Sequence, residues 1–109
     1  MIELETYESI DGRKPFELWL PQLRDKMAAM RIFKRLRSLQ LGNFGDCTPV
    51  GEGVLELRVH VGAGYRVYCA RHGQMLVVLL SGGDKSSQAA DIKTAQTYWA
   101  DWKRRREHA

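Results

Sequence analysis

An α+β fold is predicted from two regularities in the sequence. Apolar and polar residues alternate with a period of two in three short segments, whereas apolar residues recur every three to four positions in three others. Together with one uniformly apolar segment, they predict the element order β-α-α-β-β-β-α. The length of 109 residues and the hydrophobic fraction of 44% are typical of one globular domain, so residues 1–109 are expected to fold as a single unit.

The N-terminal half is predicted to contain one strand and two helices. Residues Ile2–Tyr7 alternate as in a half-buried strand, and a short helix is expected to begin near Pro15 and to end or kink at Pro21. Asp25 suits the N-cap of a second helix, Lys26–Gln40. The predicted apolar stripe of this second helix consists of Ala29, Ile32, Phe33, Leu36 and Leu39.

The C-terminal half follows a glycine-rich loop, Leu41–Gly53, and is predicted to form three strands and a helix. The strands are Val54–Val61, Tyr65–Arg71 and Gln74–Ser81, and the last is apolar on both sides, as in a central strand. Asp84 or Ser86 can cap the final helix. The core-facing residues of that helix are expected to be Ile92, Ala95, Trp99 and Trp102.

The register of the two hairpins decides which side chains share a face of the sheet. A three-residue loop over Gly62–Gly64 keeps one face apolar, and a two-residue turn is expected at His72–Gly73. The predicted pairs are Val59–Val67, Leu57–Cys69, His60–Arg66, Arg58–Tyr68, Tyr68–Val77 and Arg66–Leu79. This register gathers Arg58, His60, Arg66 and Tyr68 on the face that does not form the core.

Composition excludes several classes of protein. The longest apolar run, Met75–Leu80, is far shorter than the ~20 residues of a membrane span, and the acidic start lacks the features of a signal peptide. Cys47 and Cys69 lie far apart without histidines at metal-binding spacing, so no metal site or disulfide is expected. We therefore expect a cytoplasmic protein that contacts no membrane.

Basic residues outnumber acidic ones, 17 to 13, which gives a formal net charge of +4. Four of them share the second predicted helix and form either a solvated face or a surface that binds along a phosphate backbone: Arg31, Lys34, Arg35 and Arg37.

Two arginines on neighbouring strands, Arg58 and Arg66, repel each other unless an anion lies between them. That anion is either a carboxylate of the chain, such as Glu56, or a phosphate, which the guanidinium fork matches well. The segment Ser81–Gln88 adds Lys85 and a helix N-terminus, which is itself an anion site.

Three segments together resemble the RelE/ParE superfamily of toxin–antitoxin toxins. They are Val54–Arg58, Gly64–Tyr68 and Leu79–Lys85, and their pattern ELR…GxGYRVY…GGDKS…DI is most similar to the HigB-like branch of phage-derived addiction module killer proteins. The resemblance implies the RelE-like fold: a small antiparallel sheet with two N-terminal helices on one face and a C-terminal helix. It also implies a ribosome-dependent mRNA endonuclease that blocks translation, and an antitoxin partner, often with a helix-turn-helix domain.

The resemblance transfers catalytic roles to Arg58, Arg66 and Lys85, and more weakly to Asp91. Attack of the 2′-hydroxyl of RNA on the adjacent phosphate gives a 2′,3′-cyclic phosphate and needs no cofactor or metal. The two arginines would stabilise the phosphorane, Lys85 would hold the phosphate or assist the leaving oxygen, and Asp91 would orient a reacting group. We expect Arg66→Ala to leave folding nearly intact because the register predicts an exposed side chain.

Two further residues come from the predicted register. His60 either transfers a proton or is a surface histidine without a role, and Tyr68 either stacks on a base or covers apolar surface. Ribosomal RNA would be bound by the cations of the second helix, Arg31, Lys34, Arg35 and Arg37, and by Lys103 and Arg104 at the C-terminal end.

Two other functions remain open. ParE-like members of the superfamily inhibit DNA gyrase, and a non-catalytic member would only bind RNA or protein. The presence of Arg58, Arg66 and Lys85 favours the nuclease, because a gyrase inhibitor needs no cluster that cleaves phosphate esters.

Overall fold

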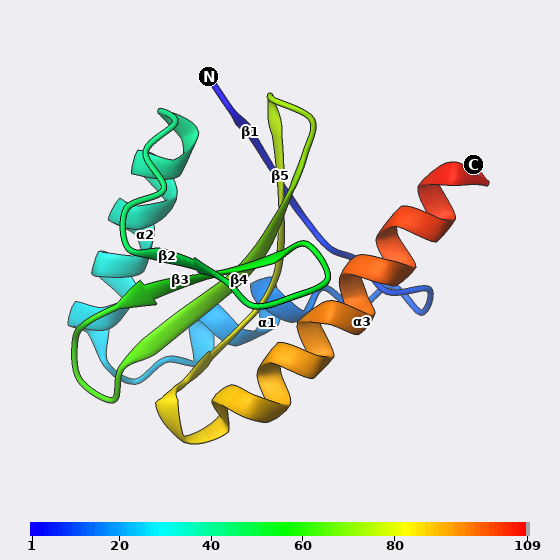
Figure 1. Cartoon of the computed structure of the whole chain (residues 1–109). Coiled ribbons are helices and arrows are strands. Elements are labelled where there is room, and N and C mark those ends of the chain that lie inside the picture. The colour runs from blue at the N-terminus through cyan, green and yellow to red at the C-terminus, as the bar shows by residue number, and fades with distance from the viewer. Residues whose placement is uncertain (109) are drawn as a thin grey trace.

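The computed structural model, which describes residues 1–108, contains one five-stranded mixed sheet and three α-helices (Figure 1). The predicted α+β class and the order of the predicted elements are confirmed. In chain order the elements are β1 (Glu3–Thr6), α1 (Pro15–Trp19), η1 (Leu20–Gln22), α2 (Lys26–Gln40), β2 (Cys47–Pro49), β3 (Val54–Val59), β4 (Tyr65–His72), β5 (Leu76–Asp84), η2 (Lys85–Ser87) and α3 (Gln88–Glu107).

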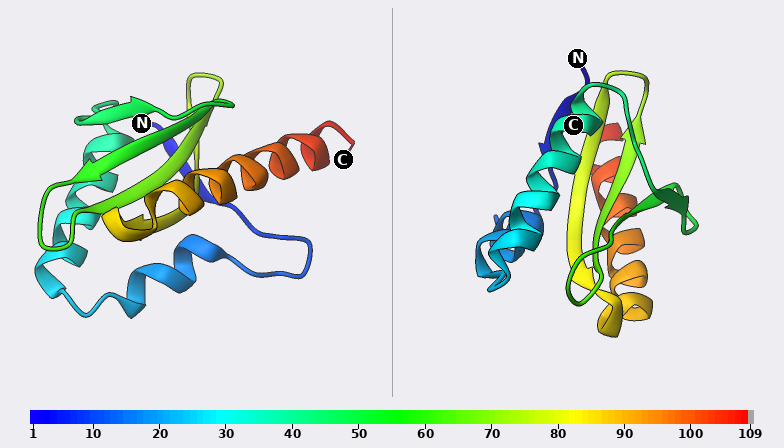
Figure 2. Two further views of the ribbon diagram at one scale, coloured as in Figure 1. Left: turned by 60° about the horizontal axis from the view of Figure 1, so that its bottom comes forward. Right: turned by 90° about the vertical axis from the view of Figure 1, so that its left-hand side faces the viewer.

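The sheet lies between two layers of helix. Helices α1 and α2 cover one face and α3 covers the other, as the right-hand view of Figure 2 shows. Each layer has its own core. On the α1–α2 side, Phe16 and Ile32 pack on Leu57 and Val67, whereas on the α3 side Trp99 and Trp102 pack among the residues Tyr7, Val54, Tyr68, Ala70, Val78 and Leu80. Apolar residues are therefore buried on both faces of the central strands.

Helix α2 begins where the sequence predicts. The Asp25 carboxylate accepts a hydrogen bond of 3.1 Å from the backbone nitrogen of Ala28, as an N-cap residue should. The side that packs on the sheet is centred on Ala28, Ile32 and Leu39. Phe33 lies about 100° further round the helix than Ile32 and is 59% exposed, so its predicted place in the core is wrong.

The sheet differs from the expected antiparallel one at both edges. Strand β1 pairs parallel to β5, with Glu3 opposite Leu76 and Thr6 opposite Leu79. Strand β2, in the segment predicted as a loop, pairs antiparallel to β3 and places Cys47 opposite Leu57. Without β2, the outer backbone groups of β3 would have no strand partner.

The hairpin registers differ from the predicted ones. Strands β3 and β4 are offset by two residues, so Arg58 lies directly opposite Arg66 and Leu57 opposite Val67, and the connection becomes the five-residue loop 60–64. The β4–β5 turn has three residues, 73–75, and an irregularity between Tyr68 and Cys69 places Arg66 opposite Gly83. Because the first offset is an even number, the faces of β3 and β4 are those that the sequence predicts.

The consecutive glycines of β5 allow close packing on both faces of the sheet. A Cβ atom on Gly82 would overlap the ring of Trp19, and one on Gly83 would overlap the carboxylate of Asp91. The absence of a side chain at Gly82 thus lets α1 pack closely on the sheet, and its absence at Gly83 lets the first turn of α3 do the same. Their role is structural, and both glycines belong to strand β5.

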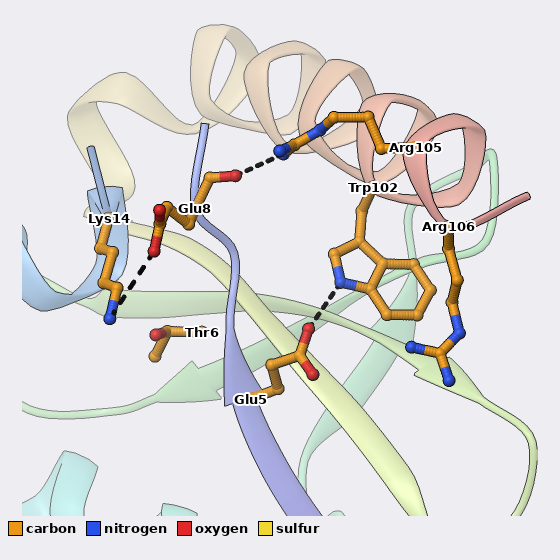
Figure 3. Close-up of a pocket in the computed structure, with 7 residues that line it drawn as sticks. All are labelled: Glu5, Thr6, Glu8, Lys14, Trp102, Arg105 and Arg106. Carbon is orange, nitrogen blue, oxygen red and sulfur yellow. Dashed lines mark hydrogen bonds and ion pairs between the residues drawn. The ribbon is translucent and has the colours of Figure 1, made fainter. Parts of the chain in front are cut away.

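Polar contacts fasten the C-terminal half of α3 to the chain around β1 (Figure 3). The indole nitrogen of Trp102 donates a hydrogen bond of 2.7 Å to Glu5, and Arg105 donates to the backbone oxygen of Glu8. Tyr7 donates a hydrogen bond of 2.7 Å to Asp101. These contacts orient α3 across the sheet and so fix the position of its N-terminus.

We expect Gly82→Ala to destabilise the fold by about 2 kcal/mol, because the added methyl group must displace the Trp19 ring. Urea denaturation measures this cost. In a Trp19→Ala background the same substitution should cost much less, since the obstructing ring is gone. Equal costs in the two backgrounds would contradict this explanation of the glycine.

Candidate functional site

Arg58 and Arg66 extend from the same face of adjacent strands. They form a directly opposed pair in the β3–β4 ladder, and both point to the face that α3 covers further along the sheet. Helix α3 begins beside them at Gln88, so its first turn borders the arginines without covering Arg58, whose side chain is 39% exposed. The predicted common face is therefore present, although each arginine has a different partner from the one expected.

A buried carboxylate lies beneath the two arginines. Glu56 is fully buried and accepts hydrogen bonds from Arg58 Nε at 3.0 Å, Tyr68 Oη at 3.2 Å and Gln88 Nε2 at 3.0 Å. The Nε atom of Arg66 lies 3.6 Å from the second oxygen of the same carboxylate. The internal ion pair that the sequence allows as an alternative to phosphate is thus present, with Glu56 shared by both arginines.

Glu56 is held in its ionised form. Burial by itself raises the pKa of this carboxyl group, but hydrogen bonds from Gln88, Arg58 and Tyr68, together with the charge of Arg66, outweigh that effect. The resulting pKa lies below the ordinary value of 4.5. Glu56 is therefore a permanent anion at neutral pH, and one negative charge is shared between two positive ones.

The ion pairs use only part of each guanidinium group. Arg58 contacts Glu56 through Nε, and within residues 1–108 its two Nη atoms make no hydrogen bond. Arg66 donates through Nη1 to the backbone oxygen of Gly64 at 2.8 Å, which leaves Nη2 without a partner in the same residues. The Glu56 carboxylate orients both groups and leaves donors for a further anion.

These donors border a surface cavity of about 510 Å³. Its walls are Arg58, Arg66 and Lys85 together with the whole β3–β4 loop, residues 60–64, and the strand residues on either side of it, Val59 and Tyr65. Lys85 is exposed and has no ion pair within residues 1–108. The structure brings together the three cations that the resemblance selects, in a cavity whose lining contains no carboxylate.

His60 lines the same cavity from the loop side. It lies outside the β3–β4 ladder and does not pair with Arg66 as predicted; its ring Nε2 forms a hydrogen bond with the carboxylate of Asp46. That hydrogen bond from His60 lowers the pKa of Asp46. The contact orients an exposed imidazole at the rim of the cavity.

Tyr68 and Asp91 do not line the cavity. Tyr68 is completely buried against α3, and burial, with the nearby charge of Glu56, raises the pKa of its hydroxyl well above the ordinary range. It can neither stack on a base nor transfer a proton near neutral pH, so a catalytic role for Tyr68 is wrong, and the alternative that it packs against apolar surface is the one present. Asp91 packs over Gly83 and accepts a hydrogen bond from Ser87.

The segment before α3 is capped by the chain itself. The predicted capping of the final helix by Asp84 or Ser86 is wrong, since α3 has Ser87 at its N-cap position; the Asp84 carboxylate instead accepts a hydrogen bond of 2.9 Å from the backbone nitrogen of Ser86. It caps the short turn η2, which leads into α3 at Gln88. A carboxylate therefore already occupies part of the anion site expected at this helix start.

The comparisons with known proteins agree with this picture. Residues 19–101 match the family of phage-derived, Gp49-like proteins. A protein of Haemophilus influenzae, described as uncharacterized, is 48% identical over 81 residues, which are 74% of this chain and 82% of the relative. This chain belongs to the Gp49-like family. That family is one of addiction-module toxins, which agrees with the resemblance in its general form.

The expected ribosome-binding residues of this Gp49-like protein differ in accessibility. Arg35 turns inward and donates hydrogen bonds to the backbone oxygens of Arg58, Phe44 and Asp46, so it supports the loop before β2. Arg104 is paired with Asp101 at 2.6 Å, and Lys103 lies over the Trp99 ring. The other expected cations of α2, Arg31, Lys34 and Arg37, are exposed.

A second concavity of the Gp49-like protein, about 490 Å³, lies between β1 and the end of α3 (Figure 3). Its lining contains charges of both signs, and these pair within the protein: Lys14 pairs with Glu8 at 3.8 Å, and Glu5 accepts a hydrogen bond from Trp102.

Residues 1–108 contain no group of three or more His, Cys, Asp or Glu that could hold a metal ion, and none of the helices in that range has the length and apolar character of a membrane span. The cavity at Arg58 is therefore the strongest candidate site.

Substitution of Glu56 should change the pH dependence of stability. Because its folded-state pKa lies below 4.5, ionised Glu56 stabilises the fold above that pH, and the stabilisation is lost as the pH falls through the folded-state value. Glu56→Gln should cost about 3 kcal/mol at pH 7 by leaving two arginines uncompensated, and less at pH 3. Urea denaturation from pH 3 to 7 measures both effects.

The matched control is Glu3→Gln, which changes an exposed carboxylate on β1. It should leave the pH profile unchanged. An equal loss of stability for Glu56→Gln at every pH would mean that the charge of Glu56 is not what stabilises the fold.

Arg66, only 9% exposed, belongs to the same buried group, so Arg66→Ala should also destabilise the protein, contrary to the expectation from sequence.

Proposed function

We propose that this Gp49-like protein is the toxin of a toxin–antitoxin module and acts as a metal-independent endoribonuclease on ribosome-bound messenger RNA. One observation carries the proposal: the free Nη atoms of Arg58 and the amine of Lys85 border one cavity with Arg66, in which no carboxylate is exposed. Such a cavity suits a phosphodiester. The resemblance to the HigB-like branch supports the same function.

The proposed reaction uses the nucleophile that RNA itself provides. The 2′-hydroxyl attacks the adjacent phosphorus, the bond from phosphorus to the 5′-oxygen breaks, and the products are a 2′,3′-cyclic phosphate and a 5′-hydroxyl end. Negative charge develops on the non-bridging oxygens during the attack. The ion pairs with Glu56 hold both guanidinium groups at Nε, and the Nη atoms of Arg58 and Nη2 of Arg66 would stabilise that charge without reorganising, which is the most effective form of electrostatic catalysis.

Lys85 and His60 line the same cavity as the two arginines. Lys85 lies at the start of η2, and we assign it to the phosphate or to the departing 5′-oxygen. His60 is the histidine of the cavity lining, and Asp46 fixes its ring. We assign it to proton transfer with the 2′-hydroxyl, because an imidazole can exchange protons near neutral pH. Asp91 is then a positioning residue of the α3 start rather than a group that touches RNA.

The composition of the cavity lining explains why the ribosome is part of the proposal. Three cations stabilise charge well, but nothing else in the cavity lining would force a flexible RNA strand into the in-line geometry that the attack requires. A ribosome that holds the message at a fixed position would supply that geometry. Inhibition of gyrase is the alternative, and it requires neither Arg58 nor Lys85 to bind a phosphodiester.

Lys85→Ala and Arg58→Ala should each reduce mRNA cleavage about 100-fold or more, by removing a donor from the developing charge. Primer extension on translating ribosomes measures discrete cuts within codons. Lys85 is exposed, so the thermal midpoint of its variant should remain that of the wild type. The control is Lys93→Ala, which removes an exposed lysine of α3 that does not line the cavity.

The result that would overturn the proposal is cleavage at the wild-type rate by the double variant Arg58→Ala, Lys85→Ala. Wild-type protein that cuts no RNA but inhibits DNA supercoiling by gyrase would establish the alternative. If neither activity is found while RNA or protein is still bound, the protein is a binding member of the family.

A further inference from the structure

The outer side of α2 carries a row of exposed apolar side chains. Met27, Met30 and Phe33 are 59%, 61% and 59% exposed, although they are large and apolar. A spacing of three residues turns each side chain by only about 60° from the last, so the three lie along one side of the helix. Contiguous exposed apolar surface of this kind marks an interaction site.

The same helix is strongly basic. Its sequence, KMAAMRIFKRLRSLQ, contains five cations and no carboxylate, and Arg35 alone among the cations is turned inward. The four others have no ion pair within residues 1–108 and lie beside the apolar row: Lys26, Arg31, Lys34 and Arg37. The exposed surface is therefore an apolar row bordered by positive charges.

This combination fits a protein better than a nucleic acid. A nucleic acid would be bound through its phosphates by the cations alone. Binding of that kind does not explain why two methionines and a phenylalanine are exposed to water. Protein interfaces are enriched in Met, Phe and Arg, and methionine adapts readily to an apolar partner. The stripe of Ala28, Ile32 and Leu39 already anchors α2 to the sheet, so the helix presents only its outer side.

We propose that this outer side of α2 binds an acidic amphipathic helix of the antitoxin. Apolar side chains of that helix would cover Met27, Met30 and Phe33, and flanking Asp and Glu residues would face the α2 cations. The 15 residues of α2 span about 22 Å, which matches a partner helix of about four turns. The inference rests on the proposed function, since it identifies the partner as an antitoxin.

The test uses the full chain and the purified protein encoded by the gene adjacent to its own. The variant Met30→Ala, Phe33→Ala removes the centre of the apolar row and replaces it with the best helix former. Its control is Ile10→Ala, Leu18→Ala, which removes two exposed apolar side chains elsewhere. Isothermal titration calorimetry gives the affinity for the partner, and fluorescence anisotropy gives the affinity for a labelled single-stranded RNA.

We expect the α2 variant to bind the partner about tenfold or more weakly, while the control and the affinity for RNA are unchanged. Met30→Glu, Phe33→Glu should weaken binding further by repelling an acidic partner. Unchanged partner binding by the α2 variants, or no binding by the wild type, would overturn the inference. So would a loss of RNA binding alone, which would make α2 a nucleic-acid surface.

The failure of this inference and the failure of the proposed function are distinguishable by RNA cleavage. The α2 variants should cut mRNA on ribosomes as the wild type does, but the partner should no longer inhibit them. A wild-type protein that binds the partner through α2 and cuts no RNA would refute the nuclease and leave the docking surface in place.

Discussion

The candidate site depends on one interaction, the shared ion pair between Glu56 and two arginines. A carboxylate without access to water is stable only if charged or polar donors surround it, and Glu56 obtains them from both neighbouring layers: Arg58 and Arg66 from the sheet and Gln88 from α3. Arg58 donates to the carboxylate through Nε, whereas Arg66 Nε lies 3.6 Å from it without a hydrogen bond, and no Nη atom of either arginine is hydrogen-bonded to Glu56. The same burial that stabilises the fold therefore directs positive charge toward the cavity.

Much of this arrangement could be predicted from alternation along β3 and β4. The pattern identifies Arg58 and Arg66 as residues of one face, and an error of two positions in the register leaves that result unchanged, because side chains alternate with a period of two. Only the pairing across the ladder changes. His60 is the exception: the longer loop removes it from the sheet, and it binds Asp46 instead of facing Arg66.

What the sequence could not provide was the depth at which each polar residue lies. A charged residue within an alternating strand is normally assigned to solvent, yet here α3 packs on that face, and Glu56 and Tyr68 become completely buried. The sequence predicts α3 and its apolar stripe, but nothing in its periodicity says how far the helix extends over β3 and β4. The position of α3 over the sheet depends instead on the glycines of β5, since only a residue without a side chain at position 83 leaves room for Asp91 at the start of α3. Arg35 shows the same limitation on α2, where a cation of a basic helix satisfies backbone carbonyls of a neighbouring loop.

The two proposed surfaces meet at the β3–β4 loop. Asp25, the N-cap of α2, lies so close to Gly62 that a Cβ atom there would overlap its carboxylate, and Gly62 belongs to the wall of the arginine cavity. A partner helix along α2 would therefore end beside the loop that carries His60. Binding on α2 would restrict a loop that has to admit RNA, even though the α2 face and the arginines belong to opposite faces of the sheet. The docking surface and the cavity are thus linked through the close approach of Asp25 to Gly62.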